Sequence, residues 1–236
     1  MAIVAEHDAF VTVGANIGSD DCAVPTCGLH WIPTRPPVVL EHWPRATAPR
    51  LGFTTVASWR GAFAPVDYHG HTYGLRVHQF RRFAELPDRT GKTFDVALDI
   101  HPAEEPDLAL LAKYGWRLLD PLDAAGEPES FARFVAESAA EFMVAKGMYV
   151  DTRGGWFSDR SACYLACGRP VLAQQTGLDA YPTGLGLVPF STLDDAIGAV
   201  ESITATYDRH AAAARELAEA YFDSDLVLTQ LIEAVT

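Results

Sequence analysis

The chain has 236 residues, of which 49% are hydrophobic and 21% are charged, and its formal net charge is −13. This composition is typical of a globular protein with a sizeable core, and the negative charge argues against nucleic acids or anionic membrane surfaces as partners. No apolar run approaches the roughly 20 residues that span a bilayer, and the start MAIVAEHDAF lacks the basic region of a secretion signal. We therefore expect no membrane span and a cytoplasmic location.

The opening of the chain predicts a strand followed by an extended connector. AFVTVGANIG has the composition of a strand that runs into a turn. The segment after it carries Pro25, Pro33, Pro36, Pro37 and Pro44 with little periodicity, which is typical of a connector rather than of a compact domain. This part of the chain therefore looks like a joint between domains.

Strands and helices alternate from residue 49 onward. The expected strands are GFTTVAS, TFDVALDI, WRLLD, EFMVAK, RPVLAQ and GLGLVPF. Helical spacing covers 76–85, 104–113 and 130–140 between them, and 192–200, 207–221 and 225–235 after them. This alternation predicts an α/β fold with a mostly parallel sheet and helices on both faces, in which ligands bind beyond the carboxyl ends of the strands.

Residues 154–177, GGWFSDRSACYLACGRPVLAQQTG, carry the strongest functional pattern. Gly154 and Gly155 let the backbone take positive φ and let a ligand approach closely. Ser158 is a favoured N-cap with Asp159 in the first turn, and the unpaired N–H groups of a helix that begins here, as far as Ser161, suit a phosphate. The spacing alone fits an ordinary helix-to-strand connection equally well.

Residues at neighbouring strand ends are expected to join this site. Lys146 ends a strand beside the turn and Arg160 lies in the first helical turn, so both could pair with a phosphate; a solvated surface position is the alternative for each. Ser58 and Trp59 follow the first strand of the sheet. Trp59 could stack on a base or sugar, although tryptophan more often belongs to the core.

The glycine-rich segment resembles the donor-binding helix of GT-B glycosyltransferases, in which a glycine turn and a helix N-terminus hold the diphosphate of a nucleotide sugar. The residues that match an ACG-x-PV strand or a GGWNS run are Gly154, Gly155, Trp156, Ser158, Ala166, Cys167, Gly168, Pro170 and Val171. The two matches differ in register. The two glutamates of the family motif fall on Gly155 and Cys163, so both carboxylates are missing, and Asp159 could reach a ribose hydroxyl instead.

The resemblance to this bacterial family covers the second domain almost completely, and it implies a domain division. Residues 1–48 are the end of an N-terminal domain and its connector, and residues 49–236 are a Rossmann-like donor-binding domain. Most of the acceptor-binding domain would then be missing, and activity of this chain alone would be doubtful. The resemblance further implies that Gln174, Gln175 and Thr176 contact the sugar; their alternative is a polar turn.

Two functions remain open from the sequence. The first is a glycosyltransferase, or its donor-binding half, that takes a nucleotide-diphosphate sugar as substrate and needs no metal or other cofactor. The second is a degenerate, non-catalytic GT-B module that binds a nucleotide or a protein partner. No G-x-G-x-x-G follows any expected strand, which counts against a dinucleotide oxidoreductase. The sequence identifies no catalytic residue, sugar or acceptor.

Metal binding is a weaker alternative at two places. Cys163 and Cys167 lie one helical turn apart, but a buried apolar role is more common for cysteine. His69, His71 and His78 gather around YHGHTYG, and their spacing offers no third ligand of a recognisable metal motif. With few cysteines in a long chain, the sequence favours free thiols over disulfides.

Overall fold

A six-stranded parallel sheet forms the centre of the molecule in this computed structural model, which describes residues 3–46 and 48–236. Residues 1, 2 and 47 of the expected connector lie outside the described residues. The strands are β3 (Phe53–Ser58), β6 (Phe94–Asp99), β7 (Arg117–Leu119), β8 (Ala140–Met143), β9 (Val171–Gln174) and β10 (Leu187–Phe190). The predicted Rossmann-like, mostly parallel α/β sheet is therefore confirmed.

The strands lie in the order β10-β9-β8-β3-β6-β7. Numbered along the chain from β3, this is the order 3-2-1-4-5-6 of a doubly wound sheet read from the other edge. The connection from β3 runs to one side and the connection into β8 runs to the other, so the winding reverses between these two strands. In doubly wound sheets ligands usually bind at such a point, which here lies at the carboxyl ends of β3 and β8.

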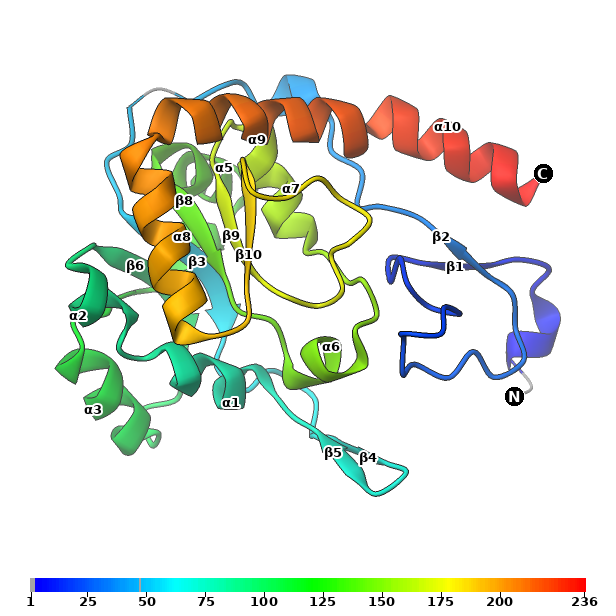
Figure 1. Cartoon of the computed structure of the whole chain (residues 1–236), viewed down its shortest axis with the longest axis horizontal. Coiled ribbons are helices and arrows are strands. Elements are labelled where there is room, and N and C mark those ends of the chain that lie inside the picture. Colours follow the sequence, from blue (N-terminus) through cyan, green and yellow to red (C-terminus); the bar gives the residue numbers. More distant parts are fainter. Residues whose placement is uncertain (1–2, 47) are drawn as a thin grey trace.

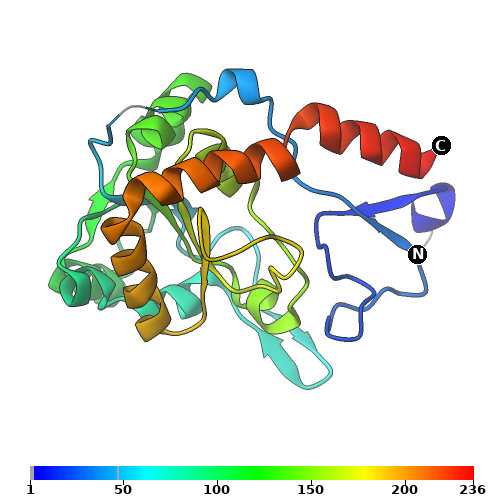
Figure 2. The same ribbon diagram turned by 45° about the horizontal axis from the view of Figure 1, so that its top comes forward.

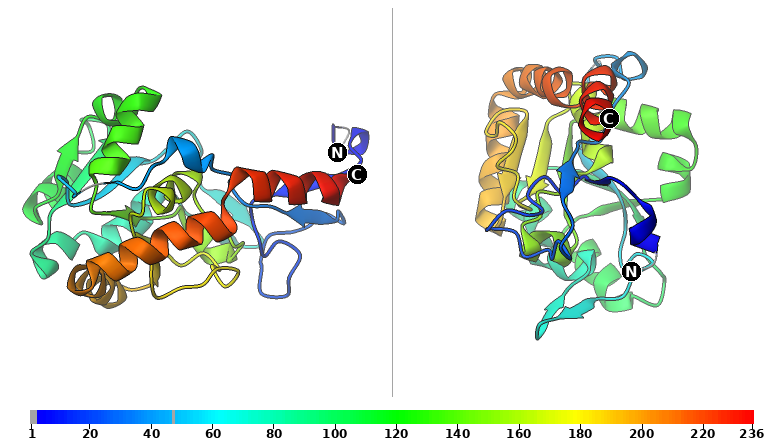
Figure 3. Two further views of the ribbon diagram at one scale, coloured as in Figure 1. Left: turned by 90° about the horizontal axis from the view of Figure 1, so that it is seen from above. Right: turned by 90° about the vertical axis from the view of Figure 1, so that its right-hand side faces the viewer.

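Helices cover both faces of the sheet (Figure 1; Figure 3, right). One face carries α1 (Arg76–Phe80), η3 (Arg81–Phe83), α2 (Leu86–Thr90), α3 (Glu105–Lys113) and α8 (Leu193–Ala205). The other carries α4 (Pro121–Ala125), α5 (Pro128–Glu137), α7 (Asp159–Ala166) and α9 (Tyr207–Tyr221). Alternate residues of one strand face the two cores: Phe142 belongs to the first cluster and Met143 to the second.

Residues 3–33 lie beside the sheet and its helices as an arm (Figures 1 and 2). The arm contains η1 (Ile3–Glu6) and the parallel pair β1 (Phe10–Thr12) and β2 (Trp31–Pro33), whereas η2 (Leu40–His42) belongs to the connector that packs on the domain. The strand expected within AFVTVGANIG is present. The connector then crosses the junction of α9 and α10 (Ser224–Val235), where the Val38 N–H donates to the Phe222 carbonyl at 2.7 Å and the Ser224 N–H donates to the Val38 carbonyl at 3.0 Å.

Two elements at the carboxyl edge are absent from the sequence expectations. The hairpin of β4 (Val66–Tyr68) and β5 (His71–Tyr73) lies between β3 and α1, and α6 (Gly147–Thr152) separates β8 from the glycine turn. The expected strand EFMVAK is correspondingly shorter, because hydrogen-bonded pairing ends at Met143. None of the described helices is long and apolar enough to cross a membrane.

Candidate functional site

Arg76 joins the carboxyl ends of β3 and β8. As the first residue of α1, it donates from Nε to the Val144 carbonyl at 2.9 Å and from Nη1 to the Ser58 carbonyl at 3.1 Å. Burial lowers the pKa of its guanidinium to about 10, with a smaller contribution from Arg160. The group stays positive at neutral pH, so a partly desolvated cation lies where the winding of the sheet reverses. Sequence reasoning missed Arg76, whose only signal was its position at a helix start on this edge.

Lys146 lies beside Arg76, where the sequence predicted a cation. It is the N-cap of α6 and lies just beyond the end of β8, after Val144 and Ala145. Its ammonium is 5.0 Å from the centroid of the Phe63 ring and 6.0 Å from that of Tyr149. Burial lowers its pKa, and so does the charge of Arg76. No carboxylate among the described residues forms an ion pair with it, which leaves its charge available to an anion.

Arg160 forms an ion pair with a buried glutamate. Its Nε donates to Oε1 of Glu141 at 2.6 Å, and the Arg160 side chain is 16% exposed while that of Glu141 is fully buried. This ion pair links the first turn of α7 to the middle of β8. We therefore assign Arg160 first to holding the helix start against the sheet, and its predicted contact with a phosphate remains a prediction.

The helix start at Ser158 is confirmed, but its capping differs from the expectation. Within the described chain the Ser158 side chain makes no capping hydrogen bond; its hydroxyl lies 3.4 Å from Asp159 Oδ1. The same carboxylate oxygen accepts the Arg160 N–H at 2.8 Å. One first-turn N–H is thus already used by a side chain. Ser158 and Ser161 are buried, and Ser161 Oγ has no hydrogen-bond partner among the described residues.

The glycine turn is packed against the N-terminal arm. Asn16 donates its backbone N–H to the Gly154 carbonyl at 3.1 Å, and its side-chain amide donates to the Arg153 and Gly177 carbonyls at 3.0 and 2.8 Å. Gly155 has φ +73°, as expected, and an added Cβ would lie 2.8 Å from the Asn16 nitrogen. The close approach that Gly155 permits is therefore to the chain's own backbone.

The residues expected to contact a sugar hold the neighbouring loops together. Gln174 is buried, accepts the Ala145 N–H at 3.1 Å and donates to Gln79 at 2.7 Å. Gln175 Oε1 accepts the N–H groups of Gly177 and Leu178, and Thr176 donates to the Trp156 carbonyl at 2.6 Å. These bonds favour the polar-turn alternative, and sugar contact stays a prediction.

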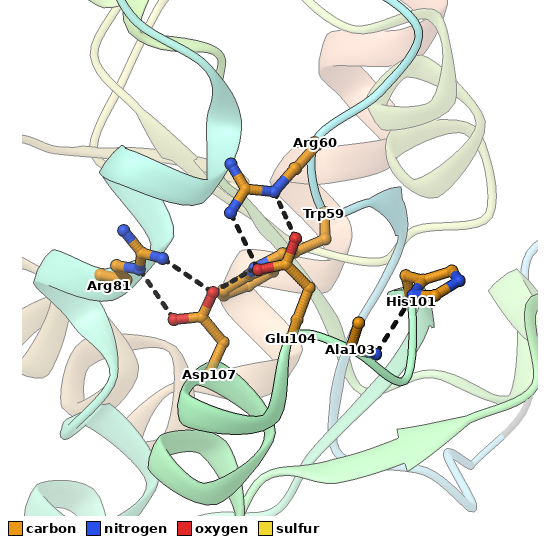
Figure 4. Close-up of polar contacts among 7 residues, drawn as sticks. All are labelled: Trp59, Arg60, Arg81, His101, Ala103, Glu104 and Asp107. Carbon is orange, nitrogen blue, oxygen red and sulfur yellow. Dashed lines mark hydrogen bonds and ion pairs between the residues drawn. The ribbon is translucent and has the colours of Figure 1, made fainter.

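A cavity of about 400 Å³ opens beyond the carboxyl ends of β3 and β6. Its lining includes Ser58, Arg60, Asp99, His101 and Glu104. Figure 4 shows two hydrogen bonds that Arg60 donates, from Nε and Nη2, to the two carboxylate oxygens of Glu104. His101 Nδ1 accepts the Ala103 N–H at 3.1 Å, which leaves Nε2 as the N–H of the neutral ring. The predicted place of Ser58 at this edge is confirmed.

Trp59 belongs to the core. Its side chain is 1% exposed, its ring packs edge-on against Phe80, and its Nε1 donates to Asp107 Oδ2 at 2.7 Å. Asp107 also accepts two hydrogen bonds from Arg81, which together with Trp59 lowers the pKa of its carboxyl group (Figure 4). The ring of Trp59 is therefore not placed to stack on a base or sugar, and the core alternative holds.

The cysteines and histidines that suggested metal sites take other positions. The four cysteines are free thiols, and no group of three metal-binding side chains occurs within residues 3–46 and 48–236. Burial raises the pKa of Cys163 to about 12 and that of Cys167 to about 11. His71 lies 3.5 Å from Asp151, so it links the β4–β5 hairpin to α6.

Comparison with solved structures identifies several proteins of similar fold. TarM of S. aureus matches with a TM-score of 0.59 at 9% identity, over 89% of this chain and 40% of TarM. An alpha-glucosyltransferase in complex with UDP matches with a TM-score of 0.58 at 11% identity, over 99% of this chain and 67% of that protein. Anabaena HepE in complex with UDP and glucose matches with a TM-score of 0.56 at 12% identity, over 87% and 56%.

The chain thus spans 40 to 67% of the length of these proteins. No protein-family model matches its sequence, and neither does any curated protein sequence. The structural neighbours are GT-B glycosyltransferases, and at such low identity the likeness concerns the architecture. The chain therefore has the fold of the GT-B glycosyltransferases, as the resemblance in its sequence implied.

Proposed function

We propose that the chain binds a nucleotide-diphosphate sugar for glycosyl transfer, with the diphosphate at the carboxyl ends of β3 and β8. The observation that carries the proposal is the pair of Arg76 and Lys146 at this point. In a protein of net charge −13, two adjacent and partly desolvated cations favour an anionic ligand over open solvent. The fold neighbours with UDP bound support the same ligand class.

The chemical role of these cations follows from where charge develops during transfer. As the bond between the sugar and the diphosphate breaks, negative charge grows on the leaving oxygen. Preorganised cations stabilise that charge without having to reorganise during the reaction. Burial and, to a smaller extent, repulsion from Arg76 lower the pKa of Lys146, and an anion between the two side chains would relieve the repulsion. In this mechanism no metal is required to neutralise the leaving group.

The glycine turn contributes differently from the sequence-based expectation. The Gly155 N–H donates to the Thr176 carbonyl at 2.8 Å, and the carbonyls of Gly154 and Gly155 face the arm. We infer that the turn supports the site by fixing the start of α7, while the cations at the strand ends supply the contacts to the phosphates. Binding roles for Ser158, Asp159 and Ser161 remain proposals of lower rank.

The second candidate is a non-catalytic module of the same fold. It is favoured by one observation: the two motif carboxylates are replaced by Gly155 and Cys163, and Gly155 is packed against Asn16. Such a module would bind a nucleotide or a protein without transferring the sugar. Nucleotide binding supports a glycosyltransferase, its donor-binding half or a nucleotide-binding module. Release of UDP from UDP-glucose identifies a catalytic chain, whereas binding without release fits the donor-binding half and the module alike.

The test is titration calorimetry of the 236-residue chain with UDP, ADP, GDP and dTDP. We expect saturable binding of at least one nucleotide. An absence of saturable binding by all four at millimolar concentration would contradict the proposed ligand class.

A further inference from the structure

An apolar pocket of about 270 Å³ adjoins the proposed phosphate site. Its surface is almost wholly carbon, and its walls come from three separate segments: the N-terminal arm at Val24, the β4–β5 hairpin at Val66, Tyr68 and Tyr73, and α6 at Met148 and Tyr149. The hydroxyl of Thr152, which also borders it, is donated to the Met148 carbonyl at 2.7 Å. The pocket therefore offers a ligand rings and methyl groups and no charge.

The hairpin that forms one wall exposes apolar side chains to solvent. Val66 is 49% exposed, Tyr68 is 40% exposed, and Phe63 just before the hairpin is 69% exposed. A cluster of this kind on an otherwise strongly acidic protein marks a binding surface more often than chance exposure does. The contact between His71 and Asp151 at 3.5 Å links the hairpin to α6 across the pocket's edge.

Tyr149 connects the pocket to the candidate phosphate site. Its ring lines the pocket, and its centroid lies 6.0 Å from the Lys146 ammonium. The other neighbour of that ammonium is Phe63, at 5.0 Å. Tyr149 also stacks on Trp156 with centroids 4.4 Å apart, so its ring is held in place. The Tyr149 ring therefore lies between a ligand in the pocket and Lys146, where the leaving diphosphate is proposed to bind.

We propose that this pocket holds the aromatic part of the acceptor, and that the acceptor is a small hydroxylated aromatic compound. The proposal rests on the proposed function. The volume lies below the roughly 300–1,000 Å³ typical of pockets for drug-sized ligands, which suits a ligand of one or two fused rings. Three tyrosine rings supply the faces and edges against which aromatic rings pack.

In the transfer, the acceptor oxygen forms a bond to the anomeric carbon of the sugar. The bond from that carbon to the diphosphate oxygen breaks, and the nucleoside diphosphate leaves with the electron pair. The hydroxyl proton passes to solvent. The pocket's part is to place the acceptor oxygen beside the sugar that the cations hold.

The experiment uses 2-naphthol as the probe and saturation-transfer NMR on the full chain. We expect saturable binding that is weakened at least tenfold in Val66→Asp, which puts a charge on the apolar wall, and in Tyr73→Ser, which removes a ring. Leu122→Asp is the matched control, because Leu122 is 75% exposed on α4 and lies outside the pocket. Thermal unfolding verifies that each variant is folded.

A second measurement tests adjacency: with UDP-glucose and 2-naphthol both bound, we expect nuclear Overhauser effects between the two ligands. The pocket assignment is overturned if 2-naphthol does not bind at millimolar concentration, or if Val66→Asp and Leu122→Asp bind it equally. The acceptor role is overturned if both ligands bind without an interligand effect. If neither UDP-glucose nor any of the four nucleotides binds, the proposed function and the acceptor role fall together, while the naphthol titration still decides the pocket.

Discussion

Two cations at the carboxyl edge of the sheet have different surroundings, and the sequence alone did not distinguish them. Lys146 and Arg160 carry the same formal charge and flank the same glycine segment. Lys146 stays free of carboxylates among the described residues, while Arg160 is paired with a buried glutamate. The difference arises from Glu141, a buried charged residue within β8. The sequence does not identify its partner, because Arg160 reaches Glu141 only when α7 packs on β8.

Replacing Lys146 by alanine is expected to weaken nucleotide binding by about tenfold or more. Hydrogen bonds to charged groups contribute roughly 1.5–3 kcal/mol, and about 1.4 kcal/mol corresponds to a factor of ten. Calorimetry against Arg133→Ala, an exposed cation on α5, provides the comparison. Equal affinity in the two variants would remove Lys146 from the site.

Replacing Arg160 by alanine is expected to lower stability. The change leaves the Glu141 carboxylate buried without its partner, which typically costs about 3–5 kcal/mol. Urea unfolding measures the loss, and the double variant Arg160→Ala with Glu141→Gln should recover part of it. If Arg160→Ala unfolds at the same urea concentration as the parent, the ion pair does not stabilise the fold.

The two cysteines on α7 should react slowly with alkylating reagents. Their raised pKa values, about 12 for Cys163 and about 11 for Cys167, mean that little thiolate exists at pH 8. Cys27 is exposed and serves as the internal reference. Mass spectrometry after brief treatment with iodoacetamide should find modification at Cys27 first. Faster modification of Cys163 would show an accessible thiolate.

At the scale of elements, the pattern of the sequence predicts the sheet well. All six strands of the central sheet were expected; most are buried apolar runs bounded by turn residues, and β7, which is largely exposed at the edge of the sheet, was expected from the apolar pair in WRLLD. The hairpin was missed because Val66–Tyr68 and His71–Tyr73 are strands of only 3 residues each that lie largely exposed, too short for a periodic pattern to show. α6 was missed because it lacks a side-chain cap within the described chain and depends on Gly147 packing against the Gly74 backbone.

The site was predicted less well than the fold for a related reason. The carboxyl ends of parallel strands meet at one edge of the sheet, so the sequence placed Ser58 and Lys146 at that edge correctly, while their binding roles stay predictions. Contacts between distant segments decide the rest. The bonds of Asn16 to the glycine turn span more than 130 residues, and no local pattern announces them.

The two glycines of the turn should differ in their tolerance of alanine. Gly155→Ala forces a left-handed backbone, which costs roughly 1–2 kcal/mol, and adds a Cβ 2.8 Å from the Asn16 nitrogen. In Gly154→Ala the nearest atoms lie at 3.6 Å, an ordinary contact. Urea unfolding of both variants tests this. Equal destabilisation would show that the arm does not pack on the turn in solution.

At the scale of the whole molecule, one sheet joins two cores. Leu172 on β9 belongs to the cluster on the face of α8, and Leu165 on α7 belongs to the cluster on the opposite face. Because the two cores share this sheet, unfolding of the strands would expose both cores at once. We therefore expect the domain to unfold as a unit although it exceeds the size at which this is usual.

Leu172→Ala and Leu165→Ala should each lower the free energy of unfolding by about 2–5 kcal/mol. Both residues are fully buried. The changes should shift one shared transition, seen at the same urea concentration by fluorescence and by circular dichroism. Two separate transitions in either variant would mean that the two faces unfold independently.

The crossing of the connector over the helix junction has a consequence for how the chain acquires its shape during synthesis. Val38 finds its partners at Phe222 and Ser224, more than 180 residues later. A ribosome delivers the connector well before these helices, and domains generally fold as units. Val38 therefore stays without these partners until α9 and the start of α10 have been made, so the crossing forms late in the assembly of this domain rather than at its nucleus.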